Sequence, residues 1–204
     1  MASQRITPEA PSRPGFMLAL LQVPQVEIPP KSFAVSAYGN AKDRQTILGR
    51  VAAAGFGDLR NKLLPLGDEE MRVWEGFGKT FLQGTILRKV GGTWIAMRLL
   101  SETQRGKRRD WTKVYPGPKT GWPTFWSLAE SLGIWTLPDD STLPQERRRT
   151  IRDGYSIVVE TQRKGKYRVY AYNNPREQKQ WPTAARMMAI GKLLGSEFPV
   201  GLKS

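Results

Sequence analysis

Two β-hairpin signals constrain this chain more than any other feature, and the first centres on two adjacent glycines. Segments 85–90 and 93–100 are rich in the β-branched and apolar residues typical of strands, and Gly91-Gly92 separates them. Because glycine adopts positive φ without steric cost, this pair favours a tight turn between antiparallel strands. The sequence therefore predicts a hairpin over 85–100.

The second hairpin signal sets a register as well as a turn. Segments 155–162 and 166–172 read as strands joined across Lys164-Gly165. A turn there places Val159 opposite Tyr170. It also places the cations Arg163, Lys166 and Arg168 on the same face, close to the turn. This face is apolar at its base, so we expect Tyr170 to pack in the core.

The remaining pattern predicts an α+β fold, a mostly antiparallel sheet packed against two or three helices. A further strand is expected over 71–81, and 101–120 reads as a loop or broken strand. The predicted helices lie at 41–54, 123–132 and 182–194. The predicted organisation is a Pro-rich extended arm (1–40), a helical lead-in (41–65) and the α+β domain (66–204).

The residue types that are missing limit the chemistry. The chain contains neither Cys nor His, which excludes thiol and imidazole catalysis, disulfides and Cys/His metal sites. Its longest apolar run, 16–21, is too short for a membrane span. We therefore expect no cofactor, no metal and no membrane span, and a protein that is not an enzyme. Whether the arm packs, exchanges with a second copy or stays mobile is left open by the sequence.

Positive charge is concentrated in three short runs. The 204-residue chain has a net charge of +14, and runs 105–113, 147–152 and 163–168 carry +4 each. Two such runs on one face would attract phosphate or another polyanion. The candidate anion-binding residues are Arg105, Lys107, Arg108, Arg109, Lys113, Arg147, Arg148, Arg149, Arg152, Arg163, Lys164, Lys166 and Arg168.

Aromatic residues close to these runs support an alternative function, the binding of single-stranded nucleic acid. Trp111, Tyr115 and Tyr167 are the candidates for stacking on bases. The competing interpretation is structural: the aromatic rings pack in the core, and the cations belong to a solvated hairpin end.

Two other motifs favour structural roles. Gly78-Lys79-Thr80 resembles the end of a phosphate-binding loop, but Val73 stands where that loop needs its first glycine, and a strand rather than a helix follows. Carboxylates suited to a hydrolase are present, yet most lie in turns or on strands. These carboxylates are Glu75, Asp139, Asp140, Asp153 and Glu160.

Several runs between about 66 and 198 resemble a family of uncharacterised exported bacterial proteins without an assigned activity. The matching runs are 71–78 (MRVWEGFG), 135–143 (WTLPDDSTL), 153–160 (DGYSIVVE), 167–175 (YRVYAYNNP) and 180–184 (QWPTA). The resemblance implies that the protein is exported and is either secreted or periplasmic. The alternative is a cytoplasmic protein. It also implies structural roles for Trp74 and Trp181 as core or cap aromatics and for Asn174-Pro175 as a break after the last strand.

Three functions remain open from the sequence. The first is a non-catalytic exported binding or accessory protein that engages an anionic protein face or envelope polymer through the basic runs. The second is a single-stranded nucleic-acid binding protein. The third is a carboxylate-based hydrolase. An oligomer formed through the arm is compatible with each of them.

Overall fold

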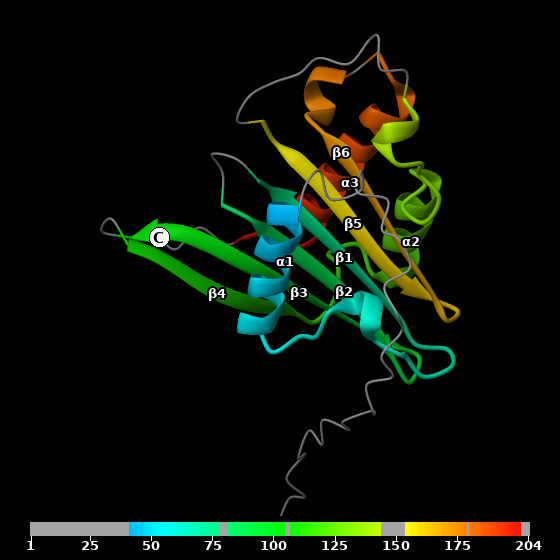
Figure 1. Cartoon of the computed structure of the whole chain (residues 1–204). Coiled ribbons are helices and arrows are strands. Elements are labelled where there is room, and N and C mark those ends of the chain that lie inside the picture. Colours follow the sequence, from blue (N-terminus) through cyan, green and yellow to red (C-terminus); the bar gives the residue numbers. More distant parts are fainter. Residues whose placement is uncertain (1–40, 78–80, 105–106, 144–153, 179, 201–204) are drawn as a thin grey trace, which may run out of the picture.

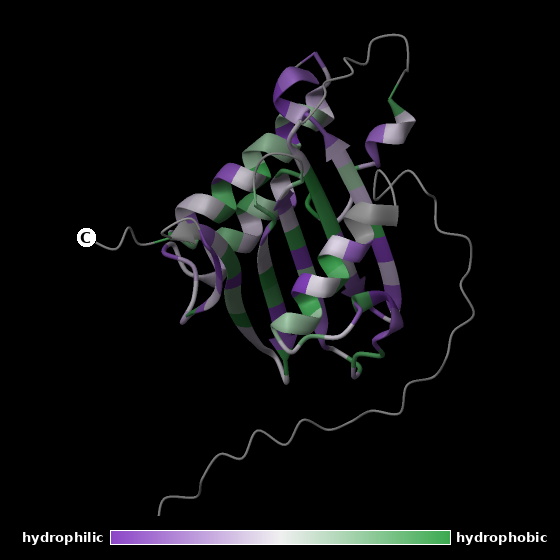
Figure 2. Cartoon of the chain, turned by 60° about the vertical axis from the view of Figure 1, so that its left-hand side comes forward, coloured by the Kyte–Doolittle hydropathy of each residue, from purple (hydrophilic) through white to green (hydrophobic). Residues whose placement is uncertain are grey.

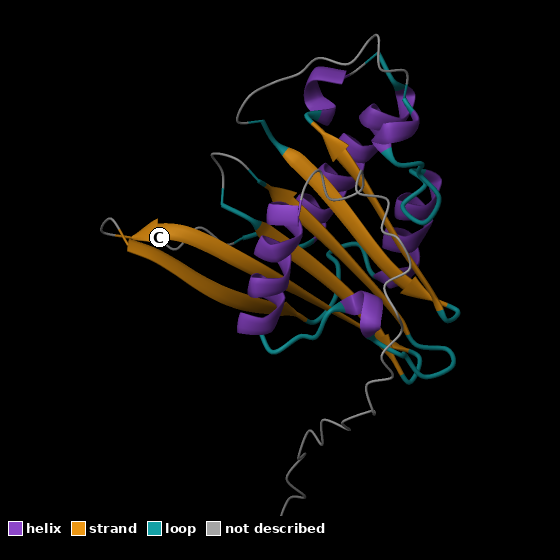
Figure 3. Cartoon of the chain, viewed as in Figure 1, coloured by secondary structure: helices purple, strands orange, loops and turns teal. Residues whose placement is uncertain are grey.

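A computed structural model of the chain describes residues 41–77, 81–104, 107–143, 154–178 and 180–200. Its centre is one six-stranded antiparallel sheet in the order β4-β3-β2-β1-β5-β6. Figure 3 shows the strands of this sheet in orange, with helices packed against it. The strands are β1 (Glu69–Gly76), β2 (Gln83–Val90), β3 (Thr93–Gln104), β4 (Lys107–Tyr115), β5 (Ser156–Arg163) and β6 (Lys166–Asn173). The sheet and its helices confirm the predicted α+β class.

Three α-helices and three short 3-10 helices complete the described part of the chain. The α-helices are α1 (Ala41–Ala53), α2 (Trp122–Ser131) and α3 (Pro182–Glu197), and the 3-10 helices are η1 (Leu59–Asn61), η2 (Asp140–Thr142) and η4 (Pro175–Gln178). The helix predicted over 182–194 continues to Glu197, whose carboxylate accepts the backbone N–H of Thr120 at 2.9 Å. None of the helices in the described ranges is long and apolar enough to span a membrane.

Both hairpins predicted from glycine turns are present. Gly91 and Gly92 have φ of 54° and 86°, and Lys164 and Gly165 have φ of 51° and 70°. Positive φ at both central residues matches the right-handed twist of the flanking strands. Val159 pairs with Tyr170 and Ile157 with Tyr172, as the turn position predicts.

Two predicted segments differ from the observed elements in their extent. The strand expected over 71–81 ends at Gly76, because Gly76 has φ of 119° and an ideal Cβ there would lie 2.7 Å from the carbonyl oxygen of Phe81. The segment 101–120, expected as a long loop or a strand broken by loops, follows the second alternative, because it contains the end of β3 and all of β4. Because β4 is an edge strand exposed over most of its length, it lacks the apolar alternation that marks a half-buried strand.

The sheet is covered on both faces, as Figure 1 shows, with α1 in front and α2 and α3 behind. Hydrophobic and hydrophilic residues alternate along the strands in Figure 2, in keeping with this arrangement. Beneath α2 and α3 the main core contains Val73, Tyr170, Phe125 and Met187. Beneath α1 a second core surrounds the fully buried Trp74. The expected core role of Trp74 is thus observed. Trp181 occupies the N-cap position of α3 without a side-chain capping bond and packs against the main core.

Candidate anion-binding surface

The two basic runs that the structure describes lie at opposite corners of the sheet. Lys107–Lys113 is on the edge strand β4, whereas 163–168 forms the tip between β5 and β6 at the other edge. The β5–β6 tip lies at the end of the sheet that holds Gly91-Gly92, and the β3–β4 tip lies at the far end. β4 and β6 are five strand spacings apart, or about 24 Å. The fold therefore does not bring these two runs onto one site.

Several candidates cannot be placed. Arg105 lies outside the described residues, and so does the whole second run with Arg147, Arg148, Arg149 and Arg152. The candidate carboxylate Asp153 falls in the same undescribed segment.

Most cations of β4 already have a partner. Arg108 lies 2.9 Å from the Asp110 carboxylate, which also pairs with Arg50 of α1 at 2.6 Å. Burial raises the pKa of Asp110, but hydrogen bonds from Ser101 and Arg108 and the charge of Arg50 outweigh it and leave this pKa lowered. Lys113 donates to the Pro199 carbonyl at 3.1 Å. The β4 run therefore serves mainly to join β4 to α1 and to the end of α3.

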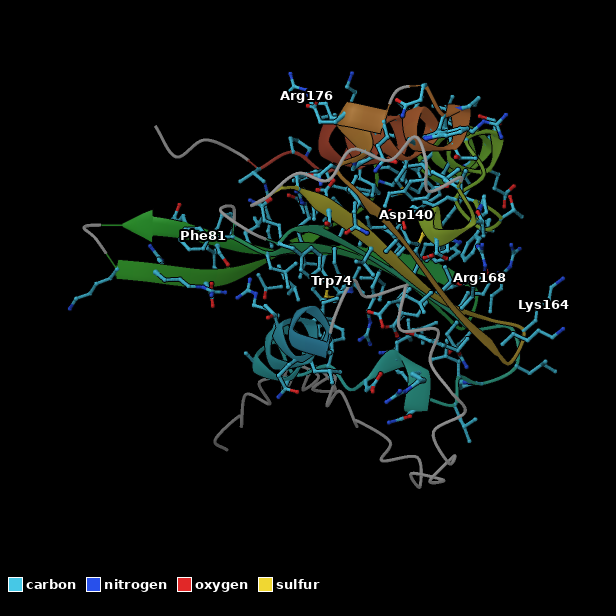
Figure 4. The ribbon with its side chains drawn as sticks, turned by 45° about the horizontal axis from the view of Figure 1, so that its top comes forward. Trp74, Phe81, Asp140, Lys164, Arg168 and Arg176 are labelled. Carbon is cyan, nitrogen blue, oxygen red and sulfur yellow. The ribbon has the colours of Figure 1, made fainter. Side chains whose placement is uncertain are left out.

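The β5–β6 tip, in contrast, presents unpaired cations. Lys164 and Lys166 are exposed, and no carboxylate among the described residues pairs with either. Arg163 is paired with Glu69 at 3.1 Å and remains 37% exposed. In Figure 4 Lys164 lies at one extremity of the molecule, far from Phe81, which lies beside Arg108. This tip therefore presents two neighbouring exposed cations without an ion-pair partner in the described part of the chain.

Arg168, the last cation of this run, has a structural role. It donates to the carbonyl oxygens of Trp135, at 2.7 Å, and Leu137. Its guanidinium carbon also lies 4.6 Å from the centre of the Tyr170 ring. Arg168 thus fastens the segment after α2 to β6, and its guanidinium, predicted to bind an anion, is engaged by groups of the protein itself.

The predicted stacking residues do not form a platform. Tyr115 is only 7% exposed and donates its hydroxyl to the Pro199 carbonyl at 2.9 Å, so its ring lies in the core rather than on an exposed surface. Tyr167 donates to Glu160 at 2.9 Å on the opposite face of the sheet from the main core. Trp111 is half-buried on β4, directly opposite the buried Leu100. These three rings do not gather beside the unpaired lysines.

A different set of aromatic residues lies beside the β5–β6 tip. The Trp94 and Trp126 ring centres are 4.4 Å apart, and those of Trp126 and Trp135 are 5.4 Å apart with planes 21° from parallel. The Arg163 guanidinium carbon lies 4.6 Å from the Trp135 ring centre. We call this row of Trp94, Trp126, Trp135 and Arg163 the tryptophan–arginine ladder. All three indoles are half-buried.

The register of the sheet explains why the ladder meets the cationic tip. Trp94 of β3 lies opposite Lys89 of β2, and Lys89 lies opposite Glu69 of β1. The next strand in the row supplies Arg163, which pairs across the turn with Lys166. Alternating side-chain direction places all of these residues on the face that α2 covers. One row across the end of the sheet thus joins the ladder to two further cations, Lys89 and Lys166.

Sequence reasoning missed the ladder because its members are far apart along the chain. The only local signal is the spacing of Trp122 and Trp126, four residues apart and therefore on one side of α2. Trp122 flanks the ladder, with its ring centre 5.9 Å from that of Trp94. The register of three strands and the path of the chain after α2 determine the rest.

The carboxylates singled out for hydrolysis are occupied by structural bonds. Asp139 accepts the backbone N–H of Ala171 at 2.9 Å, and Asp140 accepts that of Asn173 at 2.8 Å. Glu160 is buried on β5 and accepts the Trp74 indole N–H at 2.7 Å. In the described ranges, no three carboxylates gather closely enough to hold a metal ion.

Glu75 differs from these groups because its environment disfavours ionisation. Burial raises its pKa, and the nearby charge of Arg98 and a hydrogen bond from Tyr155 only partly oppose this. Tyr155 donates to Glu75 at 3.2 Å, and Arg98 lies 3.9 Å away. Gly191 of α3 covers the carboxylate so closely that an ideal Cβ at that position would lie 2.8 Å from it. The helix thus shields the Glu75 carboxylate from solvent, which is consistent with burial as the main cause of its raised pKa.

Comparison with known proteins gives no match: no family model, curated protein or solved structure matches this chain.

Proposed function

We propose that this chain is a non-catalytic binding protein that engages an anionic partner at the β5–β6 end of its sheet. The observation that carries the proposal is the contrast between the two basic edges. At the tip, the neighbouring Lys164 and Lys166 are both exposed without an ion-pair partner among the described residues. On β4, Arg108 and Lys113 are bound to groups of the protein itself, and Lys107 is the exposed cation there that has no ion-pair partner in the described ranges. Cations without internal partners are the ones free to exchange counterions for a ligand.

The environment of the carboxylates supports a binding role over hydrolysis. Asp139 and Asp140 bond backbone amides of β6, and Glu160 bonds Trp74 and Tyr167. A general acid or nucleophile must instead reach a substrate atom. These hydrogen bonds hold the three carboxylates at fixed positions, so their role is structural.

The experiment compares two double variants that lose equal charge. Lys164→Ala/Lys166→Ala removes two positive charges at the tip, and Lys107→Ala/Arg176→Ala removes two exposed ones elsewhere. Figure 4 shows Arg176 well away from Lys164. Labelled inorganic polyphosphate is titrated at several salt concentrations. The quantity measured is the slope of the logarithm of the binding constant against the logarithm of the salt concentration. We expect this slope to become less steep by about 0.7 to 0.9 for each phosphate contact that the tip variant loses, and the control variant to keep the wild-type slope. Equal loss in both variants would show a generic effect of net charge and refute the proposed site.

The cellular location belongs to the same proposal and has separate support. The resemblance of runs such as 71–78 and 153–160 to exported bacterial proteins favours action outside the cytoplasm. Fractionation of cells that express the gene from its own start tests this. Recovery in the periplasm or medium is expected, and recovery only with cytoplasmic markers would contradict it.

A further inference from the structure

The tryptophan–arginine ladder ends in a group that remains open to solvent. Trp94, Trp126 and Trp135 cover one another, and the guanidinium of Arg163 lies at the end of the row, 4.6 Å from the Trp135 ring centre. The Arg163 side chain is 37% exposed. A planar guanidinium held against an indole has a fixed orientation, and its outer face can stack on a nucleobase.

Two exposed lysines lie next to this open end. Lys164 follows Arg163 in the turn, and Lys166 lies directly opposite Arg163 in the β5–β6 register. Both lysines are exposed, and neither has an ion-pair partner in the described part of the chain. A ligand that fits this arrangement has a flat ring beside a negatively charged backbone, a combination typical of unpaired nucleotides.

We propose that the β5–β6 end binds single-stranded nucleic acid, with a base stacked on Arg163 and phosphates neutralised by Lys164 and Lys166. This inference rests on the proposed function and specifies its ligand. A duplex hides the faces of its bases in the stack, so the site prefers unpaired strands. An acidic protein surface or a polymer without rings would use the lysines but gain nothing from the ladder.

The first experiment asks whether the wild-type protein binds the bases of a strand in addition to its charged backbone. Fluorescence anisotropy compares an oligothymidylate of about fifteen nucleotides with an abasic strand of equal length and charge. Stacking of one base predicts binding of the abasic strand weaker by about fivefold or more. Equal affinity for the two strands refutes base stacking but leaves the anionic site intact, whereas binding of neither strand nor polyphosphate refutes the proposed function as well.

The second experiment tests the position of the stack at constant charge. Arg163→Lys keeps the cation but removes the planar group, and Arg108→Lys makes the same change in an arginine that covers the Phe81 ring at 5.5 Å. We expect Arg163→Lys to bind oligothymidylate several-fold more weakly while its affinity for the abasic strand is unchanged. Arg108→Lys should match the wild type with both strands. An equal effect of the two variants, or no effect of Arg163→Lys, would overturn the assignment.

Discussion

The carboxylate of Asp139 accepts the backbone N–H of the buried Ala171 at 2.9 Å, so a turn residue closes the outer side of edge strand β6. Asp140 does the same for Asn173 at 2.8 Å. Unpaired edge groups promote association between sheets, and here side chains satisfy them within the chain. The acidic pair therefore explains how the β6 edge is protected while the cationic tip of the same hairpin stays accessible.

Asp139→Ala tests this closure of the sheet. The variant leaves the Ala171 N–H buried without an acceptor and removes the cap of η2, where Asp139 also accepts the Ser141 N–H. We expect the free energy of unfolding to fall by about 1 to 3 kcal/mol in urea denaturation. Glu130→Ala, an exposed change in α2, should stay within about 0.5 kcal/mol of the wild type. Similar midpoints for the two variants would contradict the role of Asp139.

Two glycine substitutions distinguish close packing from helix preference. At Gly84 an ideal Cβ would lie 2.4 Å from the ring of Trp74, which fills the second core. Gly84→Ala should therefore destabilise the protein by about 1 to 3 kcal/mol in chemical denaturation. Gly49 of α1 has no atom within 4 Å of such a Cβ, so Gly49→Ala should stabilise it by about 0.5 to 1 kcal/mol. An unchanged free energy of unfolding in Gly84→Ala would contradict this close packing, because the Trp74 ring would then have room to shift away from the added methyl group.

Glu75 gives the fold a defined pH response. Because burial raises its pKa in the folded state, its protonated form is favoured by folding. Its contribution to stability is full below the unfolded pKa, near 4.5, and is lost as pH rises through the folded value. Glu75→Gln should therefore lose less stability than the wild type between about pH 4 and pH 8 in urea unfolding. Parallel stability profiles for the two proteins would exclude this effect.

Local signals were sufficient to predict the hairpins. Gly91-Gly92 and Lys164-Gly165 define their turns through positive φ, and the second turn also fixes the pairing of Val159 with Tyr170. Edge strand β4 was predicted only as one alternative, because its exposed, basic residues do not alternate with apolar ones. Strand propensity is a weak signal where only one neighbour and no core face determine the structure.

Only the positive charge of the candidate site could be predicted from the sequence. The 163–168 run identifies a cationic tip, but nothing local indicates that Arg168 is bound by Trp135 and Leu137 while Lys164 and Lys166 stay free. The ladder depends on β3, α2, the segment after α2 and β5 meeting at one end of the sheet. Such a juxtaposition is a property of the topology, which short sequence patterns do not contain.

The most direct test of the account locates a bound anion on the protein. Backbone amide and indole N–H signals of isotope-labelled protein are followed by NMR during titration with inorganic polyphosphate. We expect the largest shifts at Lys164, Lys166 and Arg163, with the Trp135 indole following and Lys107 of β4 unchanged. Shifts centred on Lys107 and Arg109, or spread evenly over the cations of both edges, would contradict an anion-binding site at the β5–β6 end.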